Sequence, residues 1–249
     1  MKIKELYDFL NEYCPFELAE EWDNPGLNVG RWEGEAERVL VALDVSAQTV
    51  AYAKEQGCGL ILTHHPLTMD PLKQWNDQDP AAKLLLDLAE GGIAHMACHT
   101  NLDACEGGVN TQLAAACGML EAEPFCGLGR MGRAEITFTA LAERLKKTLP
   151  AACIKGVCAR ETVSCIAVVG GSGGSLLAEA AALGCDTFVT GEVKHHQALL
   201  ARDLGMNLLV AGHYETEYIA LPPLAEALQK RFPQTEFILM PLGAVLETY

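Results

Sequence analysis

Short apolar runs alternate with segments of helical spacing along most of this chain, and no other feature constrains the fold more strongly. The runs that we expect to form strands are residues 38–44, 60–63, 93–98, 163–169, 187–190, 207–211 and 237–240. The expected helices lie between them, at about residues 46–56, 81–89, 109–117, 175–183, 194–204 and 217–230. Alternating strands and helices form layered folds in which helices cover a largely parallel sheet. The chain is therefore predicted to be α/β, with mixed, largely parallel sheets.

The stretch 121–132 is the expected seam between two lobes, because it is rich in residues that favour turns. Those residues are Pro124, Gly127, Gly129 and Gly132. We predict a first α/β lobe over residues 1–124 and a second over 125–249, with a C-terminal segment able to pack back on the first lobe. The letters LTHH at 62–65 resemble EVKHH at 192–196, and each follows an expected strand, which suggests that the two lobes are related.

The balance of charge argues against a nucleic-acid partner. The chain has 18 Lys and Arg against 33 Asp and Glu, which gives a formal net charge of −15. Binding a nucleic-acid backbone requires clustered positive charge, and the most basic stretch here, residues 144–147, is short. We therefore expect neither a nucleic-acid partner nor a DNA-encircling ring.

Hydropathy and cysteine usage indicate a protein of the cytoplasm. No apolar run is long enough to span a bilayer, and residues 1–7 lack the apolar stretch of a secretory signal. The ten cysteines contain no CxxC unit, and several lie within apolar runs. We expect them to be buried, reduced thiols that behave as small apolar side chains. A thiolate zinc site from Cys153 and Cys158 is the alternative.

Histidine and carboxylate side chains follow three of the expected strands. His64 and His65 come directly after 60–63, His99 and Asp103 follow 93–98, and His213 and Glu217 follow 207–211. Ligands of open α/β sheets collect outside the carboxyl ends of the strands. Imidazole and carboxylate gathered at such an edge make a site for a divalent metal such as zinc, manganese or iron.

The number of donors favours two metal ions rather than one. His213 and Glu217 are four residues apart, so on a starting helix they share one face. With His64, His65 and Asp103 they make five ligands, more than one tetrahedral zinc needs. Two ions that share a carboxylate suit this set, and Asp103 is the expected bridge. The donors fit zinc, iron, manganese, cobalt or nickel and do not select among them.

Four other features have a structural interpretation beside the functional one. His95 lies inside an expected strand and is predicted to be a satisfied core residue. The turn at 170–175 is either a phosphate cradle or a tight turn in which Ser175 caps the next helix. Glu192, His195 and His196 either serve catalysis or begin an exposed helix. The loop at 22–27 either lines the pocket or anchors the N-terminal helix.

Several motifs together resemble one known family, the toroidal hexamers with a dinuclear metal centre called GTP cyclohydrolase I type 2 homologues (the NIF-three-like family). The motifs are EWDNPGL at 21–27, THHP at 63–66, HTNLD at 99–103, TGEVKHH at 190–196 and GHYETE at 212–217. The resemblance implies metal binding by His64, His65, Asp103, His213 and Glu217. It also implies a homohexamer, a trimer of dimers around a central cavity. The stretch 121–161 leaves no room for the domain that some members carry mid-chain.

The expected function is that of a metal-dependent hydrolase with two divalent metal ions per chain and a small, nucleotide-like substrate. By resemblance to a GTP cyclohydrolase, water activated by the metals would attack the imidazole carbon of guanine, with loss of formate. Glu192 and His196 are the expected proton-transfer groups, and His99, Asn101 and His195 the expected substrate contacts. The alternative is a non-catalytic metal-binding, chaperone or regulatory scaffold whose hexameric ring is its function.

Overall fold

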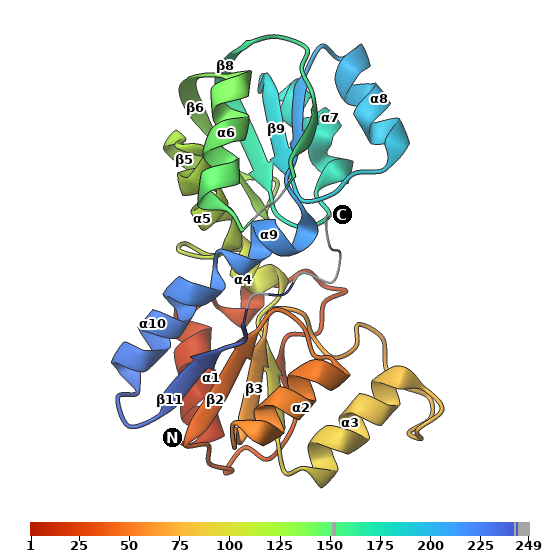
Figure 1. Cartoon of the computed structure of the whole chain (residues 1–249), viewed down its shortest axis with the longest axis vertical. Coiled ribbons are helices and arrows are strands. Elements are labelled where there is room, and N and C mark those ends of the chain that lie inside the picture. Colours follow the sequence, from red (N-terminus) through yellow and green to blue (C-terminus); the bar gives the residue numbers. More distant parts are fainter. Residues whose placement is uncertain (151–152, 242, 244–249) are drawn as a thin grey trace. The chain divides into compact units, whose positions relative to one another are not determined.

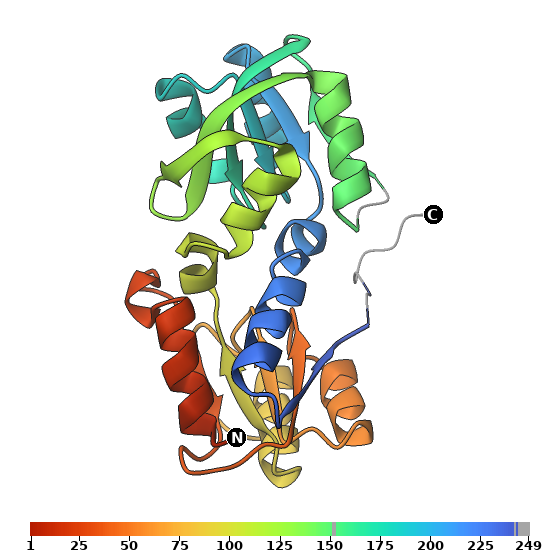
Figure 2. The ribbon, with the colours of Figure 1, turned by 90° about the vertical axis from the view of Figure 1, so that its left-hand side faces the viewer.

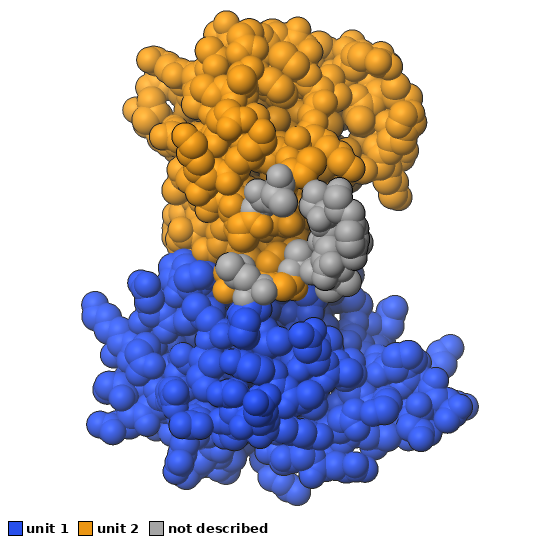
Figure 3. All heavy atoms as spheres, in the orientation of Figure 1, with its two compact units in different colours: residues 1–105, 221–242 blue, residues 106–220, 243–249 orange. Residues whose placement is uncertain are grey.

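The computed structural model describes residues 1–150, 153–241 and 243, and the chain divides into two compact units. Unit 1 comprises residues 1–105 and 221–242, and unit 2 comprises residues 106–220 and 243–249 (Figure 3). This division at 105/106 differs from the expected seam at 124/125. The reason is that residues 120–137 form a hairpin within the sheet of unit 2, so they do not link the units.

Unit 1 is built on a five-stranded sheet with the order β1-β4-β3-β2-β11. Its strands are β1 (Gly26–Val29), β2 (Arg38–Ala42), β3 (Leu60–Thr63), β4 (Ala94–Ala97) and β11 (Glu236–Leu239). The four strands from β4 to β11 are parallel, and β1 pairs with β4 in the antiparallel direction. Strand β11 comes from the C-terminal part of the chain and extends the sheet beside β2.

Helices cover both faces of this sheet. They are α1 (Ile3–Tyr13), α2 (Ala47–Glu55), α3 (Pro80–Glu90), α4 (Thr100–Ala104) and α10 (Leu221–Arg231), with a short 3₁₀ helix at Phe16–Leu18. Helices α2 and α3 pack on one face, where Leu40 and Ile61 meet Val50 and Leu88. Helices α1 and α10 lie on the other face (Figures 1 and 2). Because both faces are covered, the central strands β2, β3 and β4 are mostly apolar and are buried along nearly their whole length, rather than alternating.

Unit 2 is built on a six-stranded sheet with the order β5-β6-β8-β9-β10-β7. Its strands are β5 (Leu120–Phe125), β6 (Gly129–Thr137), β7 (Lys155–Val157), β8 (Thr162–Val169), β9 (Thr187–Thr190) and β10 (Asn207–Val210). Strands β8, β9 and β10 are parallel, and the other three pair in the antiparallel direction. The expectation of mixed, largely parallel sheets in an α/β protein is confirmed.

Two apolar clusters hold the layers of unit 2 together. The helices are α5 (Val109–Cys117), α6 (Phe138–Thr148), α7 (Leu177–Ala182), α8 (His195–Asp203) and α9 (His213–Tyr218), with a 3₁₀ helix at Gly174–Leu176. On one face, Leu113 of α5 and Leu141 of α6 pack against Val168 and Val189. On the other face, Leu177 of α7 and Ala201 of α8 pack against Phe188.

Two expected elements differ in the structure. The expected helix at 217–230 is two helices, α9 and α10, and Pro222 and Pro223 occupy the first turn of α10, where a missing N–H costs little. Strands β5 and β6 occupy the stretch that was expected to be a linker. The expected helix at 46–56 is α2, and Ser46 caps it, because the Thr49 N–H donates to Ser46 Oγ at 3.1 Å.

None of the ten cysteines, all of which the structure describes, forms a disulfide, but they are not all buried. Cys126, Cys153 and Cys158 are exposed and Cys165 is half-buried, so the expectation of burial is wrong for these residues. It is right for Cys14, Cys58, Cys98, Cys105, Cys117 and Cys185. Among the described residues, no helix combines the length and the apolar character needed to cross a bilayer.

Candidate metal centre

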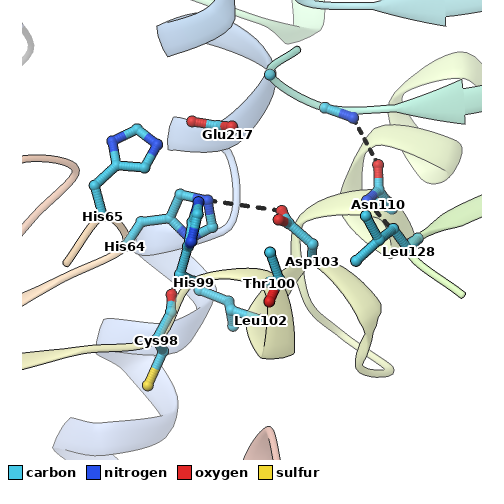
Figure 4. Close-up of polar contacts among 12 residues, drawn as sticks. His64, His65, Cys98, His99, Thr100, Leu102, Asp103, Asn110, Leu128 and Glu217 are labelled. Atoms are coloured by element: carbon cyan, nitrogen blue, oxygen red, sulfur yellow. Dashed lines mark hydrogen bonds and ion pairs between the residues drawn. The ribbon is translucent and has the colours of Figure 1, made fainter. Parts of the chain in front are cut away.

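Three histidine rings meet at the carboxyl edge of the sheet in unit 1. His64 and His65 directly follow β3, and His99 follows β4, its parallel neighbour, so the chain brings the three residues to the same edge. One ring nitrogen of each lies within 4.8 Å of the others. The ring centroids are 4.9 Å apart for His64 and His65, and 5.1 and 5.4 Å from each of these to His99 (Figure 4).

The Nδ1 atom of each ring is held by an oxygen acceptor outside the cluster. The acceptors are the Cys98 carbonyl for His64 at 2.9 Å, Asp44 Oδ1 for His65 at 2.7 Å, and Asp23 Oδ1 for His99 at 2.7 Å. A carbonyl or carboxylate accepts but does not donate, so this network assigns the ring proton to Nδ1. The lone pair is then on Nε2, which is the usual arrangement of a histidine that binds a metal.

A carboxylate lies beside these rings. Asp103 is in the short helix α4, whose first turn follows His99, and its Oδ1 is 3.6 Å from His64 Nε2 (Figure 4). The side chain of His64 is fully buried and that of Asp103 is 14% exposed. Unit 1 therefore presents three imidazoles and one carboxylate in a largely buried setting. This donor set fits a borderline divalent ion.

Asp23 supports His99 from the loop at 22–27, and the sequence alone does not reveal this role. The buried Asp23 carboxylate accepts hydrogen bonds from His99 Nδ1, from the Thr100 N–H at 2.9 Å and from the Thr100 hydroxyl. Burial by itself raises the pKa of Asp23, but these hydrogen bonds and the nearby His99 outweigh it and lower the pKa to about 2. The Trp22 ring meets the His99 ring edge-on. The loop therefore buttresses the histidine cluster.

Two residues of the same region are structural. His95 is fully buried in β4, its Nε2 lies 2.7 Å from Thr63 Oγ1, and burial lowers its pKa to about 3. This confirms the core interpretation of His95. Asn101 is also fully buried, and its amide donates to the Cys14 carbonyl at 2.7 Å at the end of α1. That burial argues against the expected contact of Asn101 with substrate.

A second group of donors lies in unit 2, at the carboxyl edge of the parallel strands β9 and β10. His213 begins α9, and its Nε2 is 3.2 Å from Oε1 of Glu217, one turn later. His213 Nδ1 is 3.5 Å from Oε1 of Glu192, in the loop that follows β9. The Glu217 side chain is 6% exposed, whereas Glu192 is exposed. Gly171, at φ +58°, is close to Glu217 Oε1, and a Cβ there would collide with it.

Three amides of the glycine-rich turn already have acceptors within unit 2. The Gly170 N–H donates to Asn110 Oδ1 at 2.8 Å, and the N–H groups of Gly171 and Gly173 donate at 3.0 Å to threonine hydroxyls. These three hydrogen bonds hold the turn against other residues of unit 2. The expected cap by Ser175 is wrong, because neither the 3₁₀ helix nor α7 has a side-chain cap. His195 and His196 lie exposed in the first turn of α8.

Comparison with known proteins gives a match over nearly the whole chain. The model of the family described as Duf34/NIF3 (NGG1p interacting factor 3) matches residues 1–242. The chain is 35% identical over 218 residues to a protein of Helicobacter pylori named GTP cyclohydrolase 1 type 2, with 86% of each chain covered. It is 34% identical to a GTP cyclohydrolase 1 type 2 homolog of Methanocaldococcus jannaschii, covering 92% of this chain and 95% of that one.

Solved structures give the same result. Reduced HcgD from Methanocaldococcus jannaschii superimposes with a TM-score of 0.89 at 31% identity, over 97% of this chain and 98% of that one. A Bacillus cereus protein related to NIF3 has a TM-score of 0.91 at 22% identity, over 100% and 99% of the two chains, and at that identity it supports the fold alone.

Proposed function

Because the chain belongs to the Duf34/NIF3 family, we propose that it is a metal-dependent hydrolase of a small, nucleotide-like molecule. The proposed ligands of two divalent metal ions are His64, His65, Asp103, His213 and Glu217. The names of its relatives, GTP cyclohydrolase 1 type 2 and its homologs, support a purine nucleotide as the substrate class. The donor set suits zinc, iron, manganese, cobalt or nickel and does not select among them.

The observation that carries this proposal is the convergence of three imidazoles whose Nδ1 atoms are all engaged elsewhere. Metal-binding histidines characteristically donate their second nitrogen to a carboxylate or carbonyl, which fixes both the tautomer and the ring orientation. A core histidine without a ligand role needs no such convergence. His99 shares this arrangement with His64 and His65, so we propose it as a further metal ligand beside the five, in place of the substrate contact that the sequence led us to expect.

The second donor group supports the same chemistry. His213 and Glu217 share one face of α9, and the carboxylate of Glu192 lies next to Nδ1 of His213, where it orients the ring. Divalent ions, when bound, supply Lewis-acid activation of water and of the bond under attack. Glu192 is the proposed group that accepts and returns a proton, and its exposure and its position beside a proposed ligand support this role. His196 is the second proposed proton-transfer residue and His195 a proposed substrate contact.

For a purine nucleotide, the proposed reaction is hydrolysis at the imidazole carbon of guanine, in which one water opens the ring to a formamide and a second water releases formate and leaves an amine. The test is to incubate metal-loaded protein with GTP and with a panel of nucleotides and phosphoesters, and to measure formate and product. We expect turnover that is lost in His64→Ala and retained in Lys147→Ala, a change on the exposed surface of α6. Protein that binds two metals but turns over nothing in the panel would support the scaffold alternative.

We also propose that the chain assembles as a homo-oligomer, a hexamer by family resemblance. Exposed apolar side chains support subunit contacts: they are Leu199 and Leu200 on α8, and Leu183 and Leu204 directly after α7 and α8. Light scattering at micromolar concentration is the measurement. A mass of 26.8 kDa, that of one chain, would contradict the assembly.

A further inference from the structure

A polar cavity of about 370 Å³ lies in unit 2 between the glycine-rich turn and the start of α8. Its lining residues are Ser172, Ser175, Glu192, Val193, Lys194 and Gln197. All of these except Val193 carry a polar or charged side chain. A cavity with such walls suits a polar group of a ligand and disfavours an apolar one.

Backbone contacts fix the segments that line this cavity. The Glu192 N–H donates to the Gly171 carbonyl at 2.9 Å, which ties the loop after β9 to the glycine-rich turn. A Cβ on Gly174 would collide with the side-chain oxygen of Gln197, and one on Gly191 would lie 2.6 Å from the Gly171 carbonyl. Glycine at these positions therefore allows the turn, the loop and α8 to approach each other. The backbone segments that carry the lining are therefore held close together, while the side chains of Ser172, Ser175, Glu192 and Lys194 are exposed.

Hydrogen-bond donors dominate the lining. The side-chain oxygen of Gln197 accepts from the Lys194 N–H at 2.7 Å. The part of the Gln197 side chain that can contact a ligand is therefore its NH₂ group, which is a donor. Lys194 adds an ammonium group, and Ser172 and Ser175 add hydroxyls. Glu192 is the carboxylate of the lining, and its Oε1 lies 3.5 Å from Nδ1 of His213. A ligand group that fits here accepts several hydrogen bonds and carries negative charge.

We propose that this cavity binds a phosphoryl group of the substrate, with Lys194 as the cation and Ser172, Ser175 and Gln197 as the neutral donors. The inference rests on the proposed function and adds where the substrate's anionic end is held. Glu192 belongs both to this cavity and to the His213 cluster, so a phosphoryl group bound here lies one side chain away from the proposed metal ligands. The backbone amides of Gly171 and Gly173 take no part, because they already donate within the unit.

The first test is calorimetric titration of metal-loaded, full-length protein with inorganic phosphate, GMP and guanosine. Loss of a hydrogen bond to a charged group costs on the order of 1.5–3 kcal/mol, so Lys194→Met should weaken phosphate and GMP roughly tenfold or more. Its affinity for guanosine should stay as in the wild type. Lys147→Met on α6 is the charge-matched control and should bind all three probes as the wild type does. Circular dichroism checks that both variants are folded.

A second variant, Glu192→Gln, should change the affinity for phosphate in the opposite direction. Glu192→Gln removes the negative charge from the cavity and keeps the shape, so affinity for phosphate should rise, whereas a cavity for sugar hydroxyls would lose affinity for guanosine. Metal content is measured in every sample, and full metal occupancy with no effect of Lys194→Met overturns the subsite and leaves the metal proposal intact. Should the wild type bind no metal, the proposed function fails, and the same comparison of Lys194→Met on metal-free protein still decides the subsite. Wild-type protein that binds neither phosphate nor GMP also overturns the phosphoryl subsite.

Discussion

Asp23 and His99 are joined by a 2.7 Å hydrogen bond although 76 positions separate them in the sequence. The bond holds the His99 ring with its proton on Nδ1, and the Asp23 carboxylate is itself fixed by two hydrogen bonds from Thr100. The acceptors of His64 and His65 act in the same way. Residues outside the cluster therefore decide how the cluster presents its nitrogens.

The first prediction concerns this support. Asp23→Ala should weaken metal binding by about 10- to 100-fold, because His99 loses the acceptor that orients its ring. Asp23→Asn should recover part of the loss, since its amide oxygen still accepts from Nδ1. The measurement is a metal titration by calorimetry or with a competing chelator. If Asp23→Ala binds metal as tightly as the wild type, His99 does not belong to the metal-facing cluster.

Local pattern was enough to predict the strand ends and the residues that follow them. The expected strands at 60–63 and 187–190 coincide with β3 and β9, because strands buried on both faces are read as uninterrupted apolar runs. Parallel pairing then brings His64 and His99 to one edge. Asp23 could not be found in this way. Its loop has no periodicity, and its partner depends on how α1 and β1 pack in three dimensions.

The hairpin of β5 and β6 was missed for a different reason. Its turn-forming residues resemble a linker, but Pro124 lies on β5, which is an edge strand, where a missing N–H does not interrupt the sheet. The backbone reverses at Cys126 and Gly127, both with positive φ. Local composition therefore indicated a break in the chain at the place where the sheet of unit 2 begins.

The second prediction uses the burial of His95. Its pKa is lowered from 6.5 to about 3, so the unfolded chain binds a proton that the folded chain does not between these values. Stability should therefore fall as pH drops below about 6.5, by up to a few kcal/mol near pH 4. Urea unfolding of metal-free protein from pH 4 to 7 measures this. His95→Phe should be less stable at pH 7, through loss of the Thr63 contact, but should show a smaller pH dependence than the exposed control His196→Ala.

The third prediction separates a steric effect from a backbone effect at Gly171. Gly171→Ala places a Cβ against Glu217 Oε1 at φ +58°, so it should both destabilise unit 2 and displace a proposed ligand. Gly57→Ala is the matched control, because Gly57 has φ +68° and nothing within 4 Å of its Cβ position. Each substitution should cost about 1–2 kcal/mol of backbone strain. Metal content should fall in Gly171→Ala alone, and equal metal content in the two variants would contradict a ligand role for Glu217.

The fourth prediction concerns the number of metal ions. We expect wild-type protein to bind two ions per chain and expect Asp103 to be their shared ligand, because a carboxylate joins two cations compactly through its two oxygens. Asp103→Ala should therefore lose both ions, whereas His64→Ala and His213→Ala should each mainly weaken one. The fold should survive in all three, since the apolar clusters that hold the layers together contain none of these residues. Metal analysis and circular dichroism on the same samples are the measurements. Saturation of the wild type at one ion per chain, or two ions retained in Asp103→Ala, would show that the centre is not built around Asp103.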